Sequence, residues 1–144
     1  MRFWWTAALL VGLDQFTKWL VKVNMMPGES FPVAPGFLYL TYVQNRGAAF
    51  SLMSGQRIFL LLTATLVVLA VVIFNQRYKP NVILQMITGL LAGGALGNLI
   101  DRINLGYVVD FLDLGWFPVF NLADSAICIA AFLFIIVSLR EETE

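Results

Sequence analysis

The sequence predicts an all-α membrane protein that forms one domain with four transmembrane helices. Two observations lead to this prediction. The chain of 144 residues is 60% hydrophobic and only 12% charged, and four of its segments are apolar over about the 20 residues that a helix needs to cross a bilayer. Its mean hydropathy is +0.82. A soluble domain normally has about 25% charged residues, so the composition argues against a soluble globular protein.

The first predicted span covers residues 3–23, and the others cover residues 58–74, 82–100 and 122–139. Residues 3–23 follow Arg2 and therefore have some features of a secretory signal peptide. However, Asp14, Lys18 and Lys22 interrupt the end of the segment, and no small-residue cleavage site follows. We therefore expect these residues to be retained as a membrane span.

The three connections between the spans differ in character. Residues 75–81 form a short link, whereas residues 24–57 form a longer loop. This loop contains FLYLTYV at 37–43, which is rich in aromatic and β-branched residues and predicts a strand or a short hairpin. The third connection, residues 101–121, is mostly apolar but contains Asp110 and Asp113.

The distribution of basic residues gives only weak information on orientation. Four spans place both termini on the side of the 75–81 link. That side holds Arg2, Arg77, Lys79 and Arg140, and the other side holds Lys18, Lys22, Arg46, Arg57 and Arg102. Counting alone does not decide the orientation. When Lys18, Arg46 and Arg102 are set aside as pairing or site residues, the rule favours cytoplasmic termini and puts the larger loops outside.

Several classes of chemistry are disfavoured by composition. The net charge is zero, which argues against a nucleic-acid partner. The chain has no histidine and a single cysteine, Cys128, so we predict no metal site, no cofactor and no intrachain disulfide. Cys128 lies in the apolar stretch ICIAAFLF, where we expect it to pack as a small apolar residue. Catalysis would then depend on Asp, Glu, Lys, Ser, Thr or Tyr.

Two charged residues fall inside the first span. Asp14 and Lys18 are four residues apart, with the acid first, so they share one face of a helix in the favourable order. Because a lone charge is costly in a bilayer, we predict a structural ion pair, and the alternative is a substrate or proton path.

The third span combines small and polar residues. Gly89, Gly93 and Gly97 recur every fourth residue, which predicts close packing against another helix. Further along, Asn98, Asp101 and Arg102 share one polar face near the end of the span. This face fits either an Asp–Arg structural clamp or part of a site.

The acidic residues suggest a chemical site. Asn121 is placed to cap the fourth span, which puts Asp124 at the third helical position, where the helix dipole stabilises a carboxylate. Asp124 is therefore either an ordinary first-turn acid or part of a catalytic pair. Two close carboxyl groups can share one proton, so that one activates water while the other polarises a carbonyl. By spacing alone the pair can be any two of Asp101, Asp110, Asp113 and Asp124.

Five blocks of the sequence resemble, in order, those of the lipoprotein signal peptidases, the type II signal peptidases of bacteria. A single block would be weak evidence, but five blocks in register are highly specific. The blocks are DQFTK at 14–18, NRGAAFS at 45–51, GGALGNLIDR at 93–102, VVDF at 108–111 and FNLADSAI at 120–127.

The resemblance implies a four-span aspartic endopeptidase of the bacterial cytoplasmic membrane, with Asp110 and Asp124 as the catalytic pair. It implies that Asn45, Asn98, Arg102 and Asn121 line the site and that Asp14 and Lys18 are structural; Asp113 lies outside the family pattern. It also implies an extracytoplasmic β-cradle, which FLYLTYV fits, and a short helix, which GAAFSLMSG fits. The expected substrate is a diacylglyceryl-modified prolipoprotein in membrane lipid, and a monomer is expected.

Two other functions predict different features of the sequence. An ion-coupled transporter predicts acids near the middle of the bilayer and inverted repeats, but the acids other than Asp14 lie at span ends and no repeat is visible. A non-catalytic assembly factor predicts that replacing the acids affects only stability.

Overall fold

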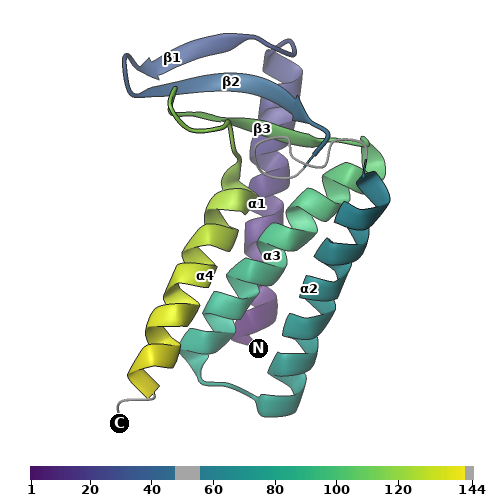
Figure 1. The fold of residues 1–144 in the computed structure, drawn as a ribbon, viewed down its shortest axis with the longest axis vertical. Helices are drawn as coiled ribbons and strands as arrows, with labels where there is room; N and C mark the ends of the chain where they lie inside the picture. The colour runs from purple at the N-terminus through teal and green to yellow at the C-terminus, as the bar shows by residue number, and fades with distance from the viewer. Residues whose placement is uncertain (48–55, 142–144) are drawn as a thin grey trace.

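The computed structural model describes residues 1–47 and 56–141 and is mostly helical, with one small sheet. In these ranges the chain forms α1 (Arg2–Asn24), β1 (Ser30–Ala34), β2 (Leu38–Asn45), α2 (Arg57–Tyr78), α3 (Val82–Asn104), β3 (Val108–Asp113) and α4 (Leu122–Glu141). The sheet covers one end of the helical bundle, and the start of α1, the end of α4 and the α2–α3 link lie at the other end (Figure 1). The short helix expected near residues 47–55 falls mainly on residues 48–55, outside the described residues.

Three of the described helices, α2, α3 and α4, are long and apolar enough to cross a membrane. α1 has the length, 23 residues, but Asp14, Gln15 and Lys18 lower its apolar character. Large apolar side chains such as Trp5, Ile73 and Phe132 point outward and are exposed, as expected for helices that face lipid rather than water. The helical membrane fold is therefore present, while membrane insertion of α1 stays a prediction.

The link between α2 and α3 is shorter than predicted. Residues 75–78, expected in the link, continue α2, and the helix ends only at Tyr78 because nothing before Pro80 breaks it. Lys79 then adopts a left-handed conformation with φ 46°. Asn81 caps α3, since its Oδ1 accepts a hydrogen bond of 2.9 Å from the amide of Leu84.

The glycines of α3 allow α1 to approach it closely, as their spacing predicted. A Cβ atom added at Gly93 would lie 2.9 Å from the carbonyl oxygen of Ala7, and one added at Gly97 would strike the Asp14 carboxylate. At both positions the added Cβ would lie closer to its neighbour than real Cβ atoms do. The α1–α3 contact, which carries Asp14 toward the centre of the bundle, therefore requires glycine at these positions.

We predict that Gly93→Ala destabilises the protein by about 1–3 kcal/mol, because the added methyl group overpacks the α1–α3 contact. Gly12→Ala in α1 is the matched control, since nothing lies within 4 Å of a Cβ at that position. Both changes improve helix propensity equally, so propensity cancels in the comparison. Thermal unfolding in detergent measures both variants. Equal stability of Gly93→Ala and Gly12→Ala would contradict the claim that the α1–α3 contact requires glycine at position 93.

The sheet is antiparallel with the order β1-β2-β3. The strand predicted at residues 37–43 is β2, but β3 was not predicted. In the register of β2 and β3, Val43 pairs with Asp110 and Asn45 pairs with Val108. The sheet thereby joins two segments that the sequence separates by two helices.

The two faces of β3 have different environments. Val109 and Phe111 are buried in a cluster with Val21 of α1 and Tyr42 of β2. On the alternate face, Val108 and Asp110 border a cavity. This alternation fixes Asp110 on the cavity side, because a shift of one residue would turn it into the apolar cluster.

Candidate active site

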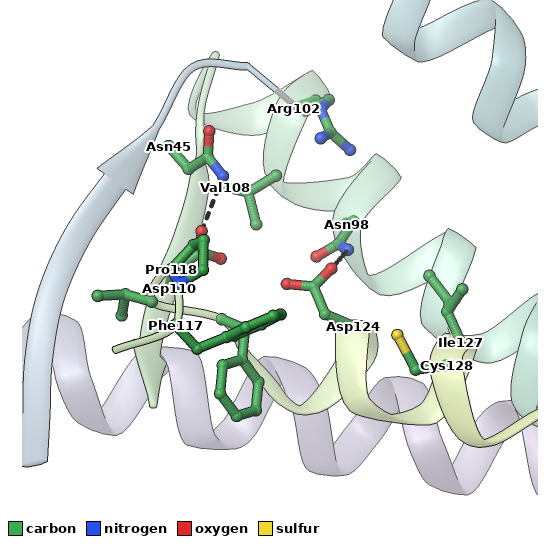
Figure 2. Close-up of a pocket in the computed structure, with 12 residues that line it drawn as sticks. Asn45, Asn98, Arg102, Val108, Asp110, Phe117, Pro118, Asp124, Ile127 and Cys128 are labelled. Carbon is green, nitrogen blue, oxygen red and sulfur yellow. Dashed lines mark hydrogen bonds between the residues drawn. The ribbon is translucent and has the colours of Figure 1, made fainter. Parts of the chain in front are cut away.

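A cavity of about 240 Å³ lies at the sheet end of the bundle, bounded by the end of β2, α3, β3 and the start of α4 (Figure 2). Five of the six predicted catalytic and lining residues border it. Its polar wall consists of Asn45, Asn98, Arg102, Asp110 and Asp124, and its apolar wall consists of Val108, Phe117, Pro118, Val119, Phe120, Ile127 and Cys128. The cavity therefore offers carboxyl groups on one side and an apolar surface on the other.

Asp110 is 1% exposed and is held by two amides. Asn45 Nδ2 donates to its Oδ2 at 2.9 Å, and Asn121 Nδ2 donates to its Oδ1 at 2.7 Å. Burial, together with the negative charge of Asp124, raises the pKa of Asp110 from 3.8 to about 7, although the two amide hydrogen bonds act in the opposite direction. Near neutral pH this carboxyl group therefore exists in both protonation states.

Asp124 lies in the first turn of α4 and is fixed by reciprocal capping. Asn121 Oδ1 accepts from the Asp124 amide at 2.8 Å, and Asp124 Oδ2 accepts from the Asn121 amide at 3.3 Å. The predicted cap is thus confirmed, and it resembles a capping box. The other oxygen, Oδ1, accepts from Asn98 Nδ2 at 2.7 Å, so the carboxyl group points into the cavity that Asp110 borders (Figure 2).

Three asparagines present their NH₂ groups to the two acids, and each orientation has a physical cause. The Oδ1 of Asn45 accepts from the Gly47 amide, that of Asn121 from the Asp124 amide, and that of Asn98 from Lys18 Nζ. These three partners can only donate hydrogen bonds. Each side-chain oxygen must therefore face its donor, which leaves the NH₂ groups to face the carboxyl groups.

Lys18 connects this network to α1. The predicted ion pair is present, because Lys18 Nζ lies 2.9 Å from Asp14 Oδ2. The same nitrogen also lies 3.1 Å from Asp101 Oδ2 and 2.9 Å from Asn98 Oδ1. All three donors of the ammonium group are thereby used. Asp14 Oδ1 in turn accepts from the Ala123 amide at 3.0 Å, so the pair also caps α4.

Asp101 and Gln15 belong to this support, and the sequence did not reveal their roles. One prediction paired Asp101 with Arg102 in a structural clamp, but Asp101 forms its ion pair with Lys18 and accepts from the Val109 amide at 3.0 Å. Gln15 Nε2 donates to Asp101 Oδ1 at 3.0 Å. The three-residue spacing of Asn98 and Asp101, which puts them on one face of α3, is the sequence pattern that could have indicated that Asp101 joins this network.

Three other residues singled out in the sequence differ in their position relative to the cavity. Arg102 borders the cavity, and its Nη2 donates to the Gly47 carbonyl at 3.0 Å. Asp113 accepts from Thr41 Oγ1 at 2.7 Å near the end of β3 and does not border the cavity. Cys128, predicted to pack as a small apolar residue, is exposed and lies on the apolar wall of the cavity.

The raised pKa of Asp110 predicts a pH-dependent stability. Between about pH 4 and 7 the folded protein retains a proton that the unfolded chain releases, so the stabilisation is complete below the unfolded pKa and is lost as pH rises through about 7. Three pKa units correspond to about 4 kcal/mol. The thermal midpoint in detergent should fall between pH 5 and 8, and it should fall less in Asp110→Asn. If the wild type and Asp110→Asn showed equal pH dependence, the raised pKa would not belong to Asp110.

Taken together, the fold and the cavity define a helical membrane protein with two carboxyl groups in one site at an end of the bundle. Comparison with known proteins identifies the family. The family model described as "Signal peptidase (SPase) II" matches residues 6–140. The chain therefore belongs to the signal peptidase II family, membrane proteases that process prolipoproteins, as the five sequence blocks predicted.

Similar proteins cover nearly the whole chain. The lipoprotein signal peptidase of Syntrophomonas wolfei is 53% identical over 141 residues, 98% of this chain and 95% of that protein. The one of Halothermothrix orenii is 44% identical and covers 93% of this chain and 92% of that protein. A solved bacterial membrane enzyme matches with a TM-score of 0.91 at 39% identity, over 95% of this chain and 87% of that one.

Proposed function

We propose that the chain is an aspartic endopeptidase that removes the signal peptide from diacylglyceryl-modified prolipoproteins, cutting directly before the lipidated cysteine. The observation that carries this proposal is that two carboxyl groups from distant parts of the sequence, Asp110 and Asp124, face one cavity. The raised pKa of Asp110, to about 7, suits a pair that holds one proton near neutral pH.

In the proposed reaction, the ionised carboxyl group of the pair takes a proton from a water molecule. The resulting hydroxide attacks the carbonyl carbon of the scissile bond, and the protonated carboxyl group donates to the carbonyl oxygen. The tetrahedral intermediate then collapses, and a proton passes from the pair to the leaving amine. The NH₂ groups of Asn45, Asn98 and Asn121 hold the two acids without supplying a competing base.

The cavity wall explains how a lipidated peptide would reach the acids. Phe117, Phe120 and Ile127 form part of an apolar surface beside Asp124. An acyl chain can lie against such a surface while the scissile bond meets the carboxyl groups at the membrane boundary. The lipid then stays in the bilayer during cleavage, which avoids the cost of exposing it to water.

We also propose that α1 is a fourth span and that both termini are cytoplasmic, with the active site at the extracytoplasmic face of the inner membrane. This arrangement is supported by the burial of Asp14 and Lys18 inside the bundle. It is also supported by the start of α1 and the end of α4, which lie at the same end of the bundle (Figure 1). In intact cells, and with the exposed Cys128 replaced by Ala, an impermeant maleimide should label Val33→Cys in β1 but not Lys79→Cys. The reverse pattern would contradict the orientation.

The function is tested with the purified protein and two forms of one precursor. A diacylglyceryl-modified prolipoprotein should be cleaved to give a new N-terminal lipidated cysteine, identified by mass spectrometry. The same precursor with Ser in place of that cysteine carries no lipid and should remain intact. Cleavage of both forms would contradict lipid recognition, and cleavage of neither would contradict the peptidase function. Because both acids belong to one chain, a monomer should suffice.

A further inference from the structure

A second apolar cavity lies between α1 and α2, away from the active site. It measures about 420 Å³, and α3 forms part of its wall. Trp4, Ala8 and Gly12 line it on one face of α1, and Val68 and Val72 line it on α2. From Trp4 to Gly12 the helix rises roughly 12 Å, which is most of the roughly 15 Å depth of one leaflet of the hydrocarbon core. We call this cavity the α1–α2 groove.

The groove adjoins a polar cavity of about 290 Å³ at the end of the bundle where α2 stops. The two cavities share Phe3, Trp4 and Val72. Side chains able to form hydrogen bonds surround the polar cavity: Asn75, Gln76, Lys79 and Gln85. Asn75 Oδ1 is a buried acceptor with no hydrogen-bond partner within residues 1–47 and 56–141. Within the described part of the chain, Asn75 Oδ1 is therefore an unsatisfied polar atom of this wall, whereas Asn75 Nδ2 donates to the Val71 carbonyl and Gln85 Nε2 donates to the Pro80 carbonyl.

The charge of the polar cavity is positive. Lys79 is the charged side chain among its lining residues, whereas Arg77 and Arg2 are close in sequence to lining residues but do not line it. No acidic residue is among its lining residues. An apolar groove of leaflet depth that adjoins a polar, positively charged cavity has the shape and charge pattern of a phospholipid with an anionic headgroup.

We propose that the α1–α2 groove binds one anionic phospholipid from the leaflet opposite the active site. Its phosphate lies in the polar cavity near Lys79, and one acyl chain lies along Trp4, Ala8 and Gly12. Trp4 sits where aromatic side chains favour the membrane interface. The lipid fills the space between two helices that both pack on α3, so it contributes to the packing of α1. This inference does not depend on the catalytic role of Asp110 and Asp124.

The charge requirement is tested by native mass spectrometry of the delipidated protein, given equal amounts of phosphatidylglycerol and phosphatidylcholine. One phosphatidylglycerol should be retained in preference. Lys79→Asn should reduce this preference about fivefold, the effect expected for one basic residue near anionic lipid; Asn tolerates the left-handed conformation at that position. Arg77→Gln is the matched control, because it removes a charge on the same turn that does not line the cavity, and it should retain the preference.

The groove itself is tested by filling it. Gly12→Leu places a side chain where nothing lies within 4 Å of a Cβ, so it should exclude the acyl chain and abolish lipid retention while the protein stays folded. Gly12→Ala should retain the lipid. Equal retention of the two lipids by the wild type, or retention by Gly12→Leu equal to that of Gly12→Ala, would overturn the proposal. A lipid-free dimer would overturn it as well, since a second copy would then cover the groove.

Discussion

Replacing either Asp110 or Asp124 by asparagine is expected to reduce cleavage of a diacylglyceryl prolipoprotein by about 10³-fold or more, because the pair loses its ability to hold and transfer one proton. Both variants should remain folded. The burial of Asp110 already disfavours its charged form. An asparagine at either position keeps one side-chain oxygen, so each variant loses one of the two hydrogen bonds that the acid accepts. Initial rates with the purified proteins, together with thermal unfolding, measure the two effects separately.

Asp113→Asn is the matched control for these variants. Asp113 is also on β3, but it accepts hydrogen bonds from Thr41 Oγ1 and the Gly115 amide outside the cavity. This variant should retain near-normal turnover. If Asp110→Asn or Asp124→Asn kept activity within a factor of about ten of the wild type, a loss too small for a proton-transferring group, the catalytic pair would be wrong.

The double variant distinguishes a pair from two independent groups. If the two acids act as one unit, Asp110→Asn combined with Asp124→Asn should be no less active than either single variant, because the first change already removes the function. If they act independently, the losses should multiply. This comparison does not require knowing which acid carries the proton, which is a property of the pair.

The sequence was informative about the helices because apolar segments of membrane length and a four-residue glycine spacing are local patterns. It was less informative about β3. VVDFLD is rich in β-branched and apolar residues, and a turn with Gly115 and Pro118 follows, but its partner is β2, separated from it by α2 and α3. The β-branched residues of this segment favour a strand. A strand of six residues whose partner is distant in sequence has no turn or hairpin signal to confirm it.

For the site, spacing alone left any two of four acids as the possible pair, and only the resemblance selected Asp110 and Asp124. The capping of α4 by Asn121 was predictable because it connects residues three apart. The contact between Lys18 and Asp101 was not, since it joins α1 to α3 across 83 positions of sequence and depends on the glycines that bring those helices together.

Replacing Lys18 by methionine is expected to cost about 3–5 kcal/mol in the free energy of unfolding, because it leaves the Asp14 and Asp101 carboxyl groups buried without their cation. Lys18 is 1% exposed, and the two acids are 0% and 2% exposed. Lys22→Met, one turn along the same helix and exposed, is the control and should cost little. Reversible unfolding in mixed detergent micelles measures both.

The same variant should lower kcat in the folded fraction, since Lys18 Nζ fixes the side-chain oxygen of Asn98. Without that donor, the Asn98 oxygen keeps only its longer hydrogen bond from Asn121 Nδ2, at 3.1 Å. The Asn98 amide is then held less firmly in the orientation in which its NH₂ group donates to Asp124. In the proposed mechanism Asp124 acts in the chemical step. A lower kcat at an unchanged KM would therefore indicate that Lys18 positions Asp124, whereas general destabilisation would lower the amount of folded enzyme.

A double variant isolates the buried pair from the packing around it. Lys18→Met with Asp101→Asn removes one of the two unpaired carboxyl groups, while the asparagine oxygen can still accept from the Val109 amide. We therefore expect a smaller loss than the sum of the single variants, with a coupling of about 0.5–3 kcal/mol. Strictly additive losses would mean that Lys18 and Asp101 do not interact energetically. In that case the glycine contacts between α1 and α3, rather than the ion pair, would hold α1 beside the active site.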